Sequence, residues 1–231
     1  MSDTLTLAIV LIPSLVIAIV FHEVAHGMVA NWLGDPTASE RNRLSLNPLR
    51  HVDPVGTLLV PGMLALASGP IFGWAKPVPI NAARLSHPFF GPRYGMMLVA
   101  IAGPGTNFIL AAIGAIALGL LGPSLAPAAG GEPGLMVQGL VYFILINVFL
   151  GMFNLLPIPP FDGSHIVEGL LPRRWVHHYA QLRPYGMLLF FALVAVTWLA
   201  PDLGVLENTI GPPVNWALEQ YLRLASAVAG E

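Results

Sequence analysis

The stretch His22-Glu23-Val24-Ala25-His26 lies inside an apolar segment that runs from residue 5 to about residue 33. A segment of this length can cross a bilayer as one helix, and it is too long for the core of a signal peptide. Ionisable side chains are costly at membrane depth, so by default they mark a working site. The sequence therefore predicts a first transmembrane helix that carries chemistry.

The composition is that of a membrane protein. Charged residues make up 10% of the 231 residues and hydrophobic residues 55%, whereas a soluble domain has about 25% charged residues. Because so few charges cannot solvate a globule of this size, apolar surface must face lipid. A cytosolic globular enzyme is excluded, and so is a nucleic-acid binder, since a net charge of −2 provides no basic face. The absence of cysteine excludes disulfides and thiolate metal sites.

The predicted fold is an all-α polytopic membrane protein with four to six transmembrane helices, in one membrane-embedded domain over residues 1–231. After the first helix, further spans are predicted at 94–121, at 135–156 and, shorter, at 185–200. Residues 213–228 predict a C-terminal amphipathic helix that lies on the bilayer or on the bundle.

Glycine and proline predict interruptions in this pattern. Gly103-Pro104-Gly105 is expected to break the span at 94–121, and the prolines within residues 157–160 are expected to end the span before them. The alternation in Arg43-Leu44-Ser45-Leu46-Asn47 predicts a short strand or the arm of a β-hairpin after the first helix.

Residues 55–74 are apolar but rich in proline and glycine, so they either span the membrane or enter it and return. Lysine and arginine number three in each of the loops 34–54, 75–93 and 157–184. A re-entrant 55–74 places all three loops on one side, which the positive-inside rule makes the cytoplasmic side. We therefore favour the re-entrant alternative, with four full spans and an external N-terminus. The excess of arginine over lysine indicates a bacterial source, and hence the bacterial cytoplasmic membrane.

The first helix carries the pattern H-E-x-x-H. Residues four apart lie nearly above one another on a helix, so His22 and His26 can bind one metal ion. Glu23 lies beside that ion, where its carboxylate can take a proton from water. The alternative is a pair of histidines that merely face the interior of a helix bundle.

A catalytic zinc ion usually has three protein ligands and one open position. Without cysteine, the third ligand must be His, Asp or Glu. Asp162 stands out because it follows the proline-rich end of a predicted span and shares the predicted depth of the two histidines. Other candidates lie in the polar loops, namely His51, Asp53, His87, His165, Glu168, His177 and His178.

Together with a second motif, Asn154-Leu155-Leu156-Pro157-Ile158-Pro159-Pro160-Phe161-Asp162-Gly163, the H-E-x-x-H stretch resembles the site-2 protease family of intramembrane zinc metalloproteases. That family pairs H-E-x-x-H with a distant N-x-x-P-x-P-x-x-D-G, and the stretch Gly103-Pro104-Gly105-Thr106-Asn107 is similar to its G-P-x-x-N element. The resemblance covers about residues 15–170. It is to the short branch, which has no PDZ domain and no nucleotide-sensing domain.

The resemblance implies a Zn²⁺ ion held by His22, His26 and Asp162, with Glu23 as the general base. It implies that Asn154 binds the substrate and that Asn107 clamps either the substrate or the metal region. For both asparagines the alternative is hydrogen bonding between helices.

The implied activity is hydrolysis of peptide bonds in or near transmembrane segments. The implied partners are the lipid bilayer and a membrane-protein substrate with an unwound transmembrane segment, which the predicted strand would engage by strand addition. The active site would face the cytoplasmic side. Two other functions remain open, a non-proteolytic metal-binding membrane protein and a catalytically inactive membrane scaffold, and the intact Glu23 argues against both. The sequence names neither the substrate nor the oligomeric state.

Overall fold

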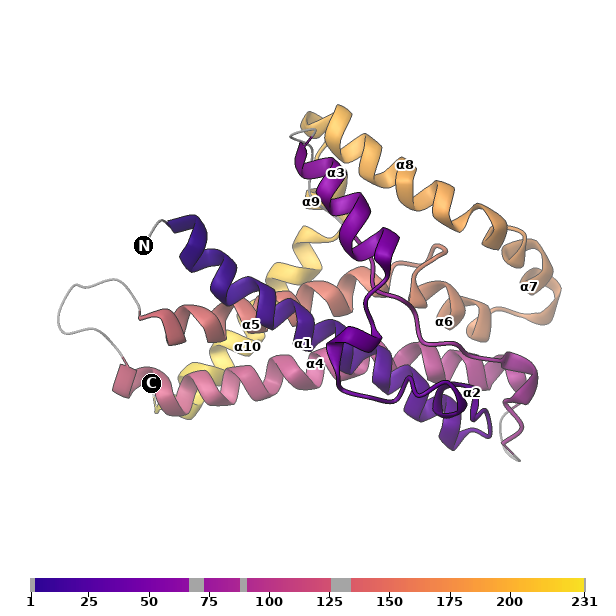
Figure 1. Cartoon of the computed structure of the whole chain (residues 1–231), viewed down its shortest axis with the longest axis horizontal. Helices are drawn as coiled ribbons and strands as arrows, with labels where there is room; N and C mark the ends of the chain where they lie inside the picture. Colours follow the sequence, from indigo (N-terminus) through magenta and orange to yellow (C-terminus); the bar gives the residue numbers. More distant parts are fainter. Residues whose placement is uncertain (1–2, 67–72, 88–90, 126–133, 231) are drawn as a thin grey trace.

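The computed structural model describes residues 3–66, 73–87, 91–125 and 134–230, and within these ranges every regular element is helical (Figure 1). The α-helices are α1 (Asp3–Trp32), α2 (Thr37–Glu40), α3 (Val60–Leu66), α4 (Pro92–Leu125), α5 (Leu135–Asn154), α6 (Asp162–Leu170), α7 (Arg173–Ala180), α8 (Gly186–Leu199), α9 (Val205–Thr209) and α10 (Gly211–Ala229). Shorter helical turns are η1 (Pro48–Arg50), η2 (Pro54–Leu59), η3 (Ala82–Arg84), η4 (Arg183–Tyr185) and η5 (Pro201–Leu203).

Four helical stretches are long and apolar enough to cross a membrane, which confirms the predicted all-α membrane fold. They are Ala8–Trp32, Pro92–Gly122, Leu135–Asn154 and Arg173–Leu199. The last begins well before the predicted 185–200, because α7 and η4 continue into α8.

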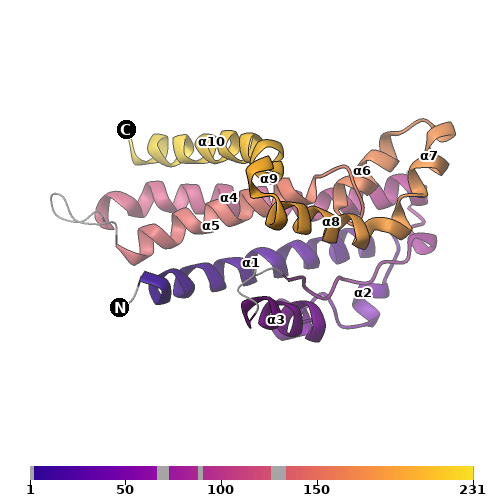
Figure 2. The same cartoon turned by 90° about the horizontal axis from the view of Figure 1, so that it is seen from above.

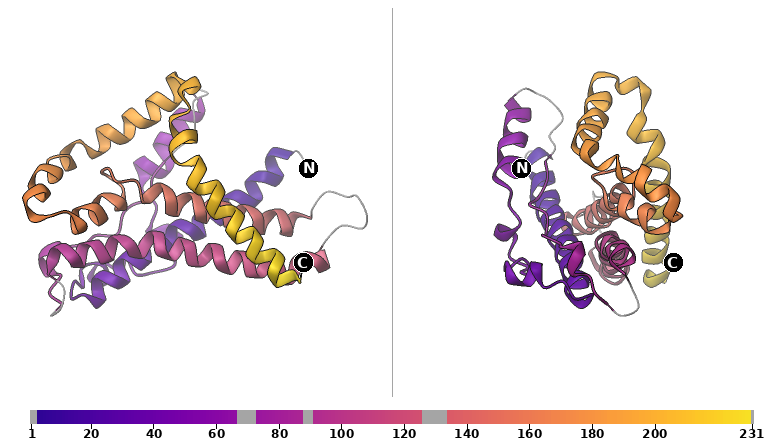
Figure 3. Two further views of the ribbon diagram at one scale, coloured as in Figure 1. Left: turned by 180° about the vertical axis from the view of Figure 1, so that it is seen from behind. Right: turned by 90° about the vertical axis from the view of Figure 1, so that its right-hand side faces the viewer.

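Helices α1, α4 and α5 run side by side as the central layer (Figure 2). The amphipathic helix α10 crosses α4 and α5 on one face of that layer (Figure 3). Val214 and Ala217 of α10 are buried in one cluster with Ala111, Ile144 and Val148 of the layer. Of the two predicted positions for this helix, the structure therefore shows the one on the bundle.

The break predicted at Gly103-Pro104-Gly105 is wrong, because α4 continues through it as one helix of 34 residues. A proline inside a helix removes one backbone hydrogen bond at a cost of about 3 kcal/mol. Pro104 is fully buried, and the packing of α4 against α1 and α5 outweighs that cost.

The β-hairpin predicted around residues 43–47 is also wrong, since this segment has no partner strand among the described residues. Hydrogen bonds that involve side chains hold the segment instead. The Arg43 guanidinium donates to the carbonyl of Lys76 at 2.6 Å, and the ring of His51 bonds the Ser45 carbonyl at 2.8 Å. Asn47 caps η1 by accepting from the Leu49 amide at 3.0 Å. The alternation in this segment therefore reflects loop packing.

The two ends of the segment 56–74 meet. The Trp74 amide donates to the Gly56 carbonyl at 3.1 Å, and the Thr57 hydroxyl donates to the Trp74 carbonyl at 2.9 Å. A complete span would place these ends on opposite sides of the bilayer, so the contact supports the re-entrant alternative. Residues 67–72 of the predicted segment lie outside the described ranges.

The loop that follows α1 is held by a buried carboxylate. Asp35 is fully buried and accepts from the backbone amides of Thr37 at 3.1 Å and of Asn81 at 2.6 Å. The Ser86 amide also donates to the Leu33 carbonyl at 3.1 Å. These bonds fix residues 81–86 against the end of α1, and so place the preceding segment beside the histidines.

Candidate metal centre

The two histidines of H-E-x-x-H meet on one face of α1, as their spacing predicts. Both imidazoles are buried, with ring centroids 4.6 Å apart and Nε2 atoms 3.0 Å apart. Asp162, the first residue of α6, brings its Oδ2 to 3.2 Å from His22 Nε2 and 3.3 Å from His26 Nε2. The structure thus joins two motifs that are far apart in the sequence.

In each imidazole, the Nδ1 nitrogen contacts an oxygen acceptor. His22 Nδ1 lies 2.6 Å from Asn107 Oδ1, and His26 Nδ1 lies 2.7 Å from the Val99 carbonyl oxygen. An acceptor at Nδ1 places the proton of a neutral imidazole on that nitrogen, so the Nε2 lone pair points the other way. Both Nε2 lone pairs therefore point toward the Asp162 carboxylate.

This donor set fits a zinc ion. The Asp162 Oδ2 atom is buried and makes no hydrogen bond, and two facing Nε2 lone pairs and a carboxylate oxygen repel one another unless a cation lies between them. Zinc with bonds of about 2.0–2.1 Å places tetrahedral ligands about 3.3 Å apart. The three measured separations, from 3.0 to 3.3 Å, agree with this value.

Two glycines make this approach possible. A Cβ atom on Gly103 of α4 would lie 2.4 Å from His26 Nε2 and 2.6 Å from His22 Cε1. A Cβ atom on Gly163 would lie 2.2 Å from the Leu155 carbonyl oxygen. Gly103 thus leaves room for the imidazoles under α4, and Gly163 lets α6 start against the end of α5 with Asp162 directed inward.

The Glu23 carboxylate is fixed beside the histidines. Glu23 is half-buried, and its Oε2 accepts a hydrogen bond from the Val78 backbone amide at 2.7 Å. The bond comes from the segment that Asp35 anchors. Sequence reasoning missed Val78, because a backbone donor carries no residue-type signal.

The two predicted asparagines occupy different surroundings. Asn107 is fully buried, and its amide donates to the Ala18 carbonyl at 3.2 Å and to Asn147 Oδ1 at 3.0 Å. Asn154 is half-buried at the end of α5 and donates to the Leu150 carbonyl of its own helix. Asn147 was missed, although a polar residue within an apolar span is a signal for such a network.

The other candidate third ligands lie apart from the histidine pair. Among the described residues, the group formed by His22, His26 and Asp162 has its potential ligand atoms within 4.8 Å of one another, and no second group of three does. Glu168 pairs with Arg183, and Asp53 caps η2. His165 is a half-buried residue of α6 whose pKa is lowered by burial and by the charge of Arg183. Of the remaining candidates, His51 bonds the Ser45 carbonyl, His87 lies with its ring tilted against Trp32, and His177 and His178 lie on α7.

Comparison with known proteins places the chain in a family. The family model described as Peptidase family M50 matches residues 132–196. The Bacillus subtilis (strain 168) protein named "Putative zinc metalloprotease YwhC" is 38% identical over 94% of this chain and 91% of its own length. The Mycolicibacterium smegmatis protein named "Putative zinc metalloprotease Rip2" is 27% identical over 80% of this chain and 66% of its own length. No solved structure matches. The chain therefore belongs to peptidase family M50, the site-2 protease family of metalloproteases.

Proposed function

We propose that this protein is an intramembrane zinc metalloprotease that hydrolyses peptide bonds in or near the transmembrane segments of membrane proteins. One observation carries the proposal: two Nε2 atoms from α1 and one carboxylate oxygen from α6 converge within 3.3 Å, next to Glu23. The names of the relatives support zinc as the metal.

His22, His26 and Asp162 hold the metal in this proposal. When bound, zinc supplies a Lewis acid that polarises the scissile carbonyl and activates water. Glu23 takes the proton from the attacking water and passes it to the leaving amine. The Val78 amide holds the Glu23 carboxylate in one orientation, which favours a single proton-transfer geometry.

The substrate must present an extended segment at this site. A carbonyl in a transmembrane helix is bonded to its own amide and shielded by side chains, so the helix has to unwind before its peptide bond can be attacked. We assign Asn154 to the substrate, because it lies at the end of α5 and is not fully buried. We assign Asn107 to the metal region, because it is fully buried and reaches the site through His22.

The metal centre belongs to the cation-rich end of the bundle in this proposal. Figure 1 shows α2, α6 and α7 at one end, with both chain termini toward the other. The three cation-rich loops 34–54, 75–93 and 157–184 adjoin these elements or contain them. By the positive-inside rule this end is cytoplasmic, so we propose that the site faces the cytoplasm of a bacterial cell.

The test is cleavage of membrane proteins by the reconstituted chain. Wild type, Glu23→Gln and the exposed-site control Glu219→Gln are each incubated with a solubilised pool of bacterial membrane proteins, and new peptide termini are identified by mass spectrometry. We expect new termini in or near transmembrane segments from wild type and Glu219→Gln. Glu23→Gln should lose about 10³-fold or more of this activity while keeping its zinc.

The same experiment distinguishes a protease from the two alternative functions, a non-proteolytic metal-binding protein and an inactive scaffold. A non-proteolytic metal-binding protein would bind zinc but give no new termini with any of the three chains. An inactive scaffold would bind no zinc in the wild-type chain.

A further inference from the structure

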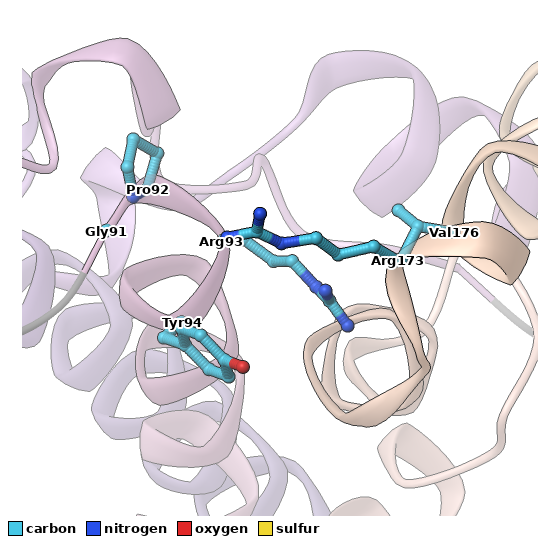
Figure 4. A pocket seen from close by; sticks show the side chains of 6 residues that line it. All are labelled: Gly91, Pro92, Arg93, Tyr94, Arg173 and Val176. Carbon is cyan, nitrogen blue, oxygen red and sulfur yellow. The ribbon is translucent and has the colours of Figure 1, made fainter.

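An open surface cavity lies away from the metal centre, between the start of α4 and the start of α7. Its volume is about 530 Å³, and it is lined by Gly91, Pro92, Arg93, Tyr94, Arg173 and Val176. Figure 4 shows the side chains of Arg93 and Arg173 extending into the same space from the two helices. Among the described residues, the lining contains two guanidinium groups and no carboxylate.

The two arginines differ in how they are held. Arg93 donates to the backbone carbonyls of Glu168 and Gly169 at 2.8 and 2.9 Å and also to the Leu171 carbonyl, and its guanidinium lies 5.6 Å from the centre of the Tyr94 ring. It is therefore fixed, but none of these partners neutralises its charge. Arg173 is exposed and makes no ion pair within the described part of the chain.

A smaller neighbouring cavity of about 250 Å³ shares Pro92 and Arg93 with this one but has a different charge balance. It contains Glu168, whose carboxylate pairs with Arg183. The smaller cavity thus holds one carboxylate beside its two arginines, whereas the described lining of the larger cavity holds none. Two guanidinium groups with no carboxylate beside them in the described lining form a positive pocket that fits a phosphate, which Arg173 can contact through paired hydrogen bonds and Arg93 attracts by its charge.

The position of the larger cavity indicates which kind of molecule carries that phosphate. Pro92 and Arg173 are the first residues of two of the four candidate membrane spans, so the cavity lies at the level of the lipid headgroups. Tyr94 and Trp175 are 50% and 53% exposed at the same level, as aromatic residues at a membrane interface are. Basic pockets between transmembrane helices on the cytoplasmic side bind anionic headgroups.

We propose that Arg93 and Arg173 form a binding site for the phosphate of an anionic phospholipid headgroup. The lipid bridges α4, which passes over the metal-binding histidines, and α7, which leads into the last candidate span. Occupancy would hold these two helices together.

The test measures lipid retained by the full-length protein. Wild type, Arg173→Gln and the matched control Arg174→Gln are reconstituted in bilayers of phosphatidylcholine with phosphatidylglycerol, released, and analysed by native mass spectrometry. Arg174 is the adjacent exposed arginine on α7 and does not line the cavity. Arg173→Gln should retain at least about fivefold less phosphatidylglycerol than wild type, and Arg174→Gln should match wild type. Arg93 is left unchanged because it also caps α6.

Three results would overturn the proposal. Equal loss in both variants would show a general effect of surface charge, and equal retention of the two lipids would show no preference for an anion. In a second arm, delipidated protein is titrated with inorganic phosphate. Phosphate binding that Arg173→Gln abolishes, without retention of phosphatidylglycerol, would assign the cavity to a soluble phosphate.

Discussion

Gly103 on α4 lies directly against His26 on α1, so that a Cβ atom added to the glycine would fall 2.4 Å from the metal-facing Nε2. The next glycine in the same motif, Gly105, has no atom within 4 Å of its Cβ position. The two glycines of Gly103-Pro104-Gly105 therefore differ, and only the first leaves room for the imidazoles of His22 and His26.

Gly103→Ala should weaken zinc binding, because the added methyl group must displace the imidazoles of His22 and His26. A displacement of this kind costs about 1–3 kcal/mol, so we expect the zinc dissociation constant to rise at least about fivefold. Competition with a chromogenic chelator measures this change. Gly105→Ala is the matched control and should bind zinc like wild type; equal weakening in both variants would contradict the assigned role of Gly103.

Asn107→Leu should also weaken zinc binding, since it removes the acceptor at 2.6 Å that fixes the tautomer of His22. Loss of such a partner typically costs 10- to 100-fold in metal affinity. Asn107→Asp keeps an oxygen acceptor at the same place and should retain more affinity than Asn107→Leu. If the two variants bound zinc equally well, the hydrogen bond to His22 would have no part in holding the metal.

Gly119→Ala should loosen α10 from the bundle. A Cβ atom at this position would lie 2.4 Å from the Ala225 carbonyl oxygen, whereas one at Gly122 would meet only the Leu118 side chain at 3.7 Å. We expect Gly119→Ala to destabilise the protein by about 1–3 kcal/mol and Gly122→Ala to have little effect. Thermal unfolding in detergent, followed by circular dichroism, compares the two; identical melting curves would refute the close packing of α10 on α4.

Asp35→Ala should destabilise the loop that follows α1. It leaves the buried amide of Thr37 and the part-buried amide of Asn81 without their acceptor, at a cost of about 3 kcal/mol. The same melting measurement checks this, with the exposed Asp202→Ala as control. Because this loop places the Val78 amide on Glu23, the variant should also lower proteolysis. Full activity together with a lowered melting temperature would show that the loop stabilises the fold but does not support the site.

The local geometry of the site was predictable, because a helix dictates which residues share a face. The spacing of His22 and His26 is enough to predict two ligands on one ion. Predicting Asp162 as the third ligand required the predicted topology and the resemblance between its motif and that of a known family. The structure then placed it within reach of both histidines.

The contacts between helices were not predictable, because they depend on the register of one helix against another. The sequence alone does not show that Asn107 bonds His22, or that the Val78 amide bonds Glu23. The same limit explains the two errors. Local patterns predicted a strand at residues 43–47 and a break at Gly103-Pro104-Gly105, but the outcome was set by side-chain hydrogen bonds in one case and by helix packing in the other.

The central claim is that two distant motifs form one zinc site, and the zinc content of the purified protein tests it most directly. Elemental analysis is carried out on wild type, His26→Ala and Asp162→Ala after zinc loading in detergent, without any need to know the substrate. We predict about one zinc ion per wild-type chain and its loss, or severe weakening, in both variants. Wild-type protein that stays free of zinc, or an Asp162→Ala variant that binds zinc as tightly as wild type, would contradict the account.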